Sequence, residues 1–170
     1  DLIFLQEVGP QHSAVTVSLP LRTQEPVAWS AEQGGAVSLA GGLIDLEAAP
    51  GVLEYSLGSD EVVVAEVVGL DTLAPYTLAA SGIASWFQPE AKGIAFVFNP
   101  THLTSSDPIA FTIDSAALGD EQPVEGTVFD IFTVHPDTAI AESAGTATLN
   151  ADGQISGDPE AQLSQLTTII

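Results

Sequence analysis

The chain has 170 residues, a length suited to one domain with a sizeable hydrophobic core. Hydrophobic residues make up 45% of it, while 23 acids against two cations, Arg22 and Lys92, give a formal net charge of −21. Such a chain repels nucleic-acid phosphates, so no nucleic-acid partner is expected, and it also repels anionic membrane surfaces. The absence of cysteine excludes a disulfide framework, a thiolate zinc site and a cysteine nucleophile.

High negative charge keeps a protein soluble in salt and favours basic or calcium-bearing partners, so we expect a saline or extracellular setting, with the protein secreted or at the cell surface. An acidic bias of the organism's whole proteome would produce the same composition. No apolar run approaches the roughly 18 residues of a membrane span, so no membrane insertion is expected. The chain also lacks methionine and starts at Asp1, which fits a chain whose signal peptide was removed or a piece of a longer protein.

Alternation of apolar and polar residues dominates the chain from its N-terminal part onward. The run "AVTVSLPL" (14–21) predicts a strand that Pro20 places at an edge or a bulge. The run "GLIDLEA" (42–48) places Ile44, Leu46 and Ala48 on one face and Leu43, Asp45 and Glu47 on the other. Further short β-rich runs between turn residues are "EVVVAEVV" (61–68), "GIAFVFN" (93–99), "PIAFTID" (108–114), "GTVFDIFTV" (126–134) and "GTATLNADGQIS" (145–156). This spacing predicts an all-β sandwich of jelly-roll topology, about nine strands, in one domain over residues 1–170.

Little helix is expected. The candidates are a turn in "LDTLAPYTLAA" (70–80) and a short helix in "DPEAQLSQL" (158–166), with Asp158 as N-cap and Pro159 at the first helical position. The stretch "NPTHLTSSDP" (99–108) is expected to be an exposed loop. The strands on either side of it should turn their apolar side chains into the core; these are Phe96, Phe98, Phe111 and Ile113.

The segment "NADGQISGD" (150–158) has some residues of a calcium-binding EF-hand loop. In that alignment Thr148 and Pro159 fall at the first and last ligand positions, where carboxylates are needed, so the calcium geometry fails. We interpret the segment as a hairpin whose turn has Gly153 in the left-handed conformation.

No nucleophile elbow, phosphate-binding loop or Walker lysine occurs, so we expect no catalytic residue and no enzyme. His12, His102 and His135 lie near prolines in expected turns, and "HPD" (135–137) is itself interpreted as a turn, so no metal site is nominated and no cofactor is required. Asp45 and Glu47 are more simply a solvated face, though they could contribute to a loose Ca²⁺ site. Four aromatic residues could stack on sugar rings if exposed, but core packing is their usual role; these are Trp29, Tyr55, Tyr76 and Trp86.

Several segments together resemble cohesin domains, which are nine-stranded jelly rolls related to carbohydrate-binding modules and found outside the cell. They are "GLIDLEAAPGVLEYS" (42–56), "VVAEVVGLDTLA" (63–74), "KGIAFVFNPTHLTSSDPIAFTI" (92–113) and the last strands. The resemblance spans roughly residues 10–156 and consists of apolar patterns and turns. It implies binding of a dockerin-type partner through one sheet face, here the outer face with Leu43, Asp45 and Glu47.

The chain departs from cohesins where their dockerin contacts lie. Gly41 and Leu43 stand at positions of polar residues in the family, and Ala49 replaces the acid of its "DP" turn. The leading hypothesis is therefore a non-catalytic protein-interaction module. The alternatives are a structural subunit of a filament, surface layer or viral capsid, built from copies of itself, and a carbohydrate-binding module.

Overall fold

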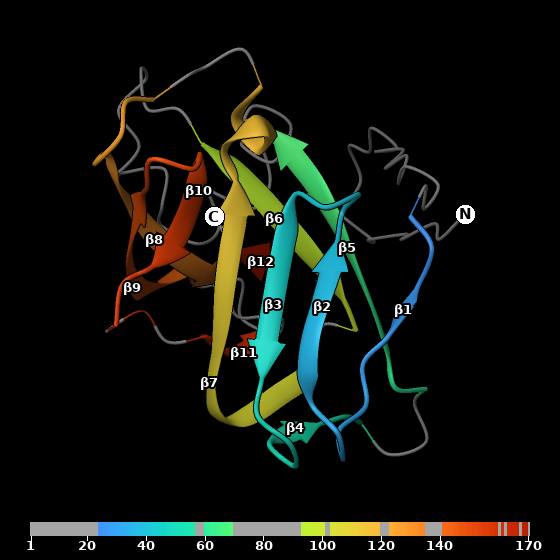
Figure 1. The fold of residues 1–170 in the computed structure, drawn as a ribbon. Helices are drawn as coiled ribbons and strands as arrows, with labels where there is room; N and C mark the ends of the chain where they lie inside the picture. The colour runs from blue at the N-terminus through green and yellow to red at the C-terminus, as the bar shows by residue number, and fades with distance from the viewer. Residues whose placement is uncertain are drawn as a thin grey trace, which may run out of the picture.

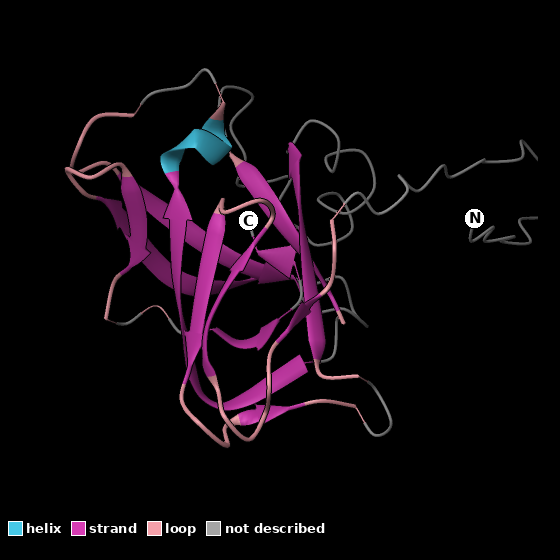
Figure 2. Ribbon diagram, turned by 45° about the vertical axis from the view of Figure 1, so that its right-hand side comes forward, coloured by secondary structure: helices cyan, strands magenta, loops and turns pink. Residues whose placement is uncertain are grey.

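The computed structural model describes residues 24–56, 60–69, 93–100, 103–119, 123–134, 141–159, 161, 163–166 and 168–169. These residues form a two-layered antiparallel β-sandwich, which confirms the all-β fold expected from the sequence (Figure 1, Figure 2). The described strands number twelve rather than about nine, because the segments between the predicted runs add short strands such as β4 (Leu53–Glu54). Within the described ranges the helical structure is one 3-10 turn, η3 (Ser115–Leu118).

The first layer consists of six strands in the order β8-β9-β10-β7-β3-β2, and β7, β3 and β2 face the viewer in Figure 1. Non-consecutive strands are neighbours in this layer, as is usual in sandwiches with crossover connections. The bounds are β2 (Gly35–Leu39), β3 (Ile44–Ala48), β7 (Leu103–Asp114), β8 (Val128–Val134), β9 (Ala141–Leu149) and β10 (Gln154–Gly157).

The second layer has the order β1-β5-β6-β12, with β1 (Val27–Ala28), β5 (Val62–Gly69), β6 (Ile94–Asn99) and β12 (Thr168–Ile169). Because β12 also pairs with β8, a continuous ladder joins the two layers on one side of the sandwich. On the opposite side β2 lies beside β1 and β5, and no ladder among the described strands connects them. We call this open side the seam.

Strand β3 shows how the sequence pattern produces the sandwich. Ile44, Leu46 and Ala48 are buried, and Asp45 and Glu47 between them are exposed, as predicted. A strand turns successive side chains to opposite faces, so this alternation fixes which face of the layer meets the core.

The core lies between the inner faces of the two layers. The four residues predicted to line it, Phe96, Phe98, Phe111 and Ile113, are all at most 5% exposed. Phe96 and Phe98 lie on β6 in the second layer, whereas Phe111 and Ile113 lie on β7 in the first. Consecutive strands therefore supply opposite walls of one hydrophobic cluster.

The prediction of a loop over residues 99–108 is wrong for most of its length, because β7 already begins at Leu103. Leu103 is fully buried, and the first part of β7 pairs with β4 and with β11 (Leu163–Leu166). The polar residues that predicted a loop lie where the pairing of β7 with β11 is irregular. Between two ladder pairs β7 advances from Thr104 to Ile109 while β11 advances only from Gln165 to Leu163. The extra residues bulge outward, and a proline is tolerated at such a bulge.

The prediction of a C-terminal helix over residues 158–166 is also wrong. Leu163 and Leu166 have the spacing of a helical apolar face, yet both are buried core residues of strand β11. The register irregularity in this strand turns both side chains inward, so a helix-like spacing arises without a helix. Asp158 does not act as an N-cap; its carboxylate accepts hydrogen bonds from two threonine hydroxyls instead.

The hairpin interpretation of residues 145–156 is confirmed. Strands β9 and β10 pair through a turn in which Asn150 Oδ1 accepts hydrogen bonds from the amides of Asp152 and Gln154, each at 3.0 Å. Gly153 has φ +79°, the left-handed conformation that glycine adopts most readily.

Several predicted features lie outside the described residues. They are the strand over residues 14–21, the turn in residues 70–80, the "HPD" turn, the three histidines, Tyr76, Trp86 and both cations.

Candidate interaction surface

The outer face of β2, β3 and β7 carries short or acidic side chains. We call it the acidic face and define it by Ala36, Ser38, Asp45, Glu47, Ala110 and Thr112. The ladder register aligns them in two rows across the three strands, Ser38–Asp45–Thr112 and Ala36–Glu47–Ala110. All are exposed except Thr112, which is half-buried. The two carboxylates are thus flanked by small neighbours, and a partner can approach the strands closely.

Two of the three residues predicted to bind a partner lie on this face. Asp45 and Glu47 project from the middle of β3, with their side chains exposed. Leu43 precedes β3 in the turn from β2, and it is half-buried against the hydrophobic core. Its carbonyl accepts a hydrogen bond from the amide of Asp114 at 3.0 Å, so Leu43 joins the turn to β7.

Charge on the described part of the chain has one sign. It contains most of the 23 acids, whereas Arg22 and Lys92 both lie outside it. The two carboxylates of the acidic face therefore have no lysine or arginine partner among the described residues. An unpaired surface carboxylate is fully hydrated and available to a cationic group of another molecule.

Hydroxyl groups continue the acidic face toward β9 and β10. Ser156 lies opposite Thr112 on one side and Thr148 on the other. At the far end the carboxylate of Asp158 accepts hydrogen bonds from Thr146 Oγ1 at 2.5 Å and Thr148 Oγ1 at 3.1 Å. Asp158 is therefore engaged within the fold, in contrast to Asp45 and Glu47.

In the part of the chain that the structure describes, no three acidic or histidine side chains come together as metal ligands would. Asp45 and Glu47 are two residues apart on one strand face and supply carboxylates from one side only. The described residues therefore do not assemble the many oxygen ligands that calcium takes in a closed site.

Trp29 is a core residue that bridges the two layers at one end of the seam. It is 1% exposed, its amide donates to the carbonyl of Glu61 at 2.9 Å, and its indole Nε1 donates to the carbonyl of Gly35 at 3.0 Å. Tyr55 Oη donates to the Trp29 carbonyl at 2.6 Å, and burial, with the nearby Glu61 carboxylate second, raises the pKa of Tyr55 to about 12. Neither face of the Trp29 ring is available to stack on a sugar.

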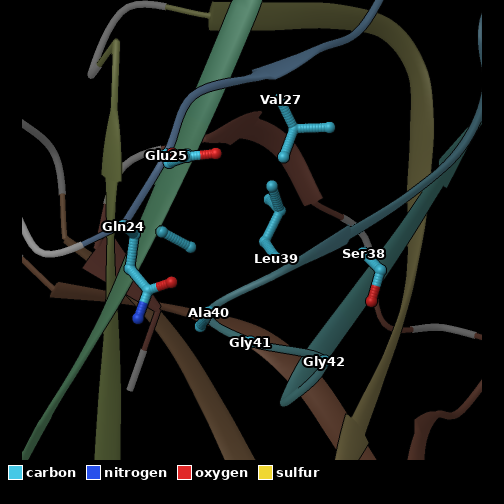
Figure 3. A pocket seen from close by; sticks show the side chains of 9 residues that line it. Gln24, Glu25, Val27, Ser38, Leu39, Ala40, Gly41 and Gly42 are labelled. Carbon is cyan, nitrogen blue, oxygen red and sulfur yellow. The ribbon is translucent and has the colours of Figure 1, made fainter.

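The other end of the seam holds an open cleft of about 290 Å³ (Figure 3). Figure 3 shows Val27 and Leu39 pointing toward one another across it. Glu25 is the one charged residue among the described residues that line it. The lining comprises Gln24, Glu25 and Val27 before and in β1, Ser38 and Leu39 in β2, the turn residues Ala40, Gly41 and Gly42, and Ala65 of β5.

Comparison with protein-family models, curated proteins and solved structures gives no match for this chain. No helix in the described ranges is long and apolar enough to cross a membrane.

Proposed function

We propose that this domain is a non-catalytic protein-interaction module that binds a protein partner through the acidic face. The observation that carries the proposal is the pair of exposed carboxylates, Asp45 and Glu47, on a face of otherwise small side chains with no cation among the described residues. A partner that presents lysine or arginine at matching positions gains complementary charge without displacing an existing ion pair.

The resemblance to cohesins suggests a dockerin-type module as the partner class, acting outside the cell. The polar contact positions of that family are not reproduced at Gly41 and Leu43, so recognition here would depend on Asp45 and Glu47 instead. Charge complementarity chiefly accelerates association and excludes wrong partners, and its effect weakens as salt screens the charges.

The test is a pull-down with calcium-loaded dockerin-type modules, repeated with a chelator. The wild type is compared with an Asp45→Asn/Glu47→Gln double variant, which keeps side-chain size and removes both charges. A matched control, Glu125→Gln/Asp152→Asn, removes two exposed charges from turns elsewhere. We expect the face variant to retain about tenfold less partner and the control to bind as the wild type.

Two outcomes would refute the proposal. One is that no module is retained by the wild type, and the other is that the face variant binds as well as the wild type. Light scattering of the same samples tests the alternative of a structural subunit, because self-association would produce large species without any added partner.

A further inference from the structure

Strand β2 has one edge with which none of the described strands pairs. The carbonyl of Leu43 bonds to the amide of Asp114 on β7, and main-chain groups of successive residues in an antiparallel strand point to alternate sides. The residues of β3 opposite Gly35, Val37 and Leu39 therefore direct their main-chain amides and carbonyls toward β2, and these three β2 residues direct theirs toward β3. The amides and carbonyls of the two residues in between, Ala36 and Ser38, consequently face the seam.

Strand β5 presents a second open edge to the same seam. Trp29 donates to the carbonyl of Glu61, so the odd-numbered residues of this strand point toward β1. The β1–β5 ladder ends at the pair Val27–Val63, and past Val63 no described strand pairs with β5 on that side. The main chain of Ala65, which also lines the cleft, therefore faces the seam.

The sequence of β2 leaves its edge unprotected. Edge strands of stable proteins are usually blunted by a charged side chain or a proline, but "GAVSL" contains neither. Beside this edge the cleft offers an apolar contact on Val27 and Leu39 and one carboxylate, Glu25. An added strand requires a row of main-chain groups and pockets for its alternate side chains, and the seam offers both.

We propose that the seam beside β2 binds an extended, basic peptide segment of a partner protein as an added β-strand. Its main chain bonds to Ala36 and Ser38. Alternate apolar side chains enter the cleft against Leu39, and the lysine or arginine side chains between them meet Glu25 and the acidic face.

The occupant is basic because no described residue carries a compensating cation, and a second copy of this chain, also at −21, would be repelled. This binding mode goes beyond contact with the acidic face, because its main-chain pairing with β2 is independent of that face and only its basic side chains rest on the proposed function.

The experiment uses the full 170-residue chain, ¹⁵N-labelled, and a capped hexapeptide of alternating lysine and valine as the probe. Titration followed by NMR gives the Kd, and hydrogen exchange gives the protection of the Ser38 amide. We expect binding of the lysine peptide to slow exchange at Ser38 by about tenfold or more, and a peptide with glutamate in place of lysine to bind at least about tenfold more weakly.

Ser38→Pro removes the seam-facing amide without removing a β2–β3 hydrogen bond, since proline is tolerated on a strand edge. It should weaken peptide binding by about tenfold or more, whereas Ser38→Ala, the matched control, should bind as the wild type. Glu25→Gln should weaken binding of the lysine peptide and reduce its salt dependence. A peptide N-methylated at every residue makes the same test on the wild-type protein in either strand orientation, so the result does not depend on folding of the proline variant.

Equal binding of the N-methylated peptide or by Ser38→Pro would overturn strand addition. Equal binding of the glutamate peptide would overturn the basic character of the occupant. A Ser38 amide already protected in the free protein would show that residues of the chain itself occupy the edge, and would likewise overturn the proposal.

Discussion

The substitution Leu103→Ala tests whether Leu103 is a buried strand residue or a loop residue. Leu103 is 0% exposed and lies in the hydrophobic cluster, with Leu166 of β11, also 0% exposed, as its ladder partner. Truncation removes the isopropyl group from a site closed by two layers, and such substitutions cost about 2–5 kcal/mol. For a domain of this size about 3 kcal/mol lowers the Tm by roughly 6–12 °C, a large part of a typical total stability of about 5–15 kcal/mol.

Urea unfolding followed by circular dichroism gives the free energy of unfolding of the variant and the wild type. Ser106→Ala is the matched control, because Ser106 is exposed in the irregular stretch of the same strand, and it should change stability by less than about 0.5 kcal/mol. If Leu103→Ala costs as little as Ser106→Ala, residue 103 lies in a loop, and the assignment of β7 from Leu103 is wrong.

Three further predictions concern the stability of the domain and rest on two polar side chains and on the net charge. Ser105 Oγ is buried and has no hydrogen-bond partner among the described residues, so Ser105→Ala should raise the free energy of unfolding by about 1 kcal/mol in the same urea assay, and a loss would contradict this. The Tm should rise with sodium chloride from low to molar concentration, because the acids repel one another and salt screens them over about 10 Å at 0.1 M; a Tm insensitive to salt would refute the repulsion. Tyr55→Phe should cost about 1 kcal/mol near neutral pH through the lost bond to the Trp29 carbonyl. Because the folded state raises the pKa of Tyr55 to about 12, its neutral phenol stabilises the fold below pH 10, and this contribution should disappear between pH 10 and 12 in wild type but not in Tyr55→Phe.

The sequence predicts elements well where one strand face is buried and the other is solvated. In β3 the alternation from Ile44 to Ala48 is complete, so both the core residues and the exposed pair Asp45 and Glu47 could be read from it. In β7 the polar stretch from Thr104 to Pro108 conceals a strand, because its irregular pairing with β11 removes the period of two. Pairing between strands so distant in the chain carries no local sequence signal.

The acidic face could largely be predicted from the sequence, whereas the seam could not. The acidic face follows from the alternation within single strands, and only the identity of the neighbouring strands required the structure. The seam exists because β2 lies beside β1 and β5 at one side of the sandwich, and no ladder among the described strands joins β2 to either of them. No motif marks Glu25, Ser38 or Ala65 as neighbours of one cleft.

The bonds of Trp29 have a mechanical consequence for the seam. Through its amide, indole and carbonyl this residue is tied to Glu61, Gly35 and Tyr55, which belong to three separate segments. On this side no described ladder joins the layers, and the hydrogen bond from the Trp29 indole to Gly35 of β2 is a direct link between them. We therefore expect any separation of the layers along the seam to be smallest beside Trp29 and largest at the cleft, where Glu25 and Leu39 lie.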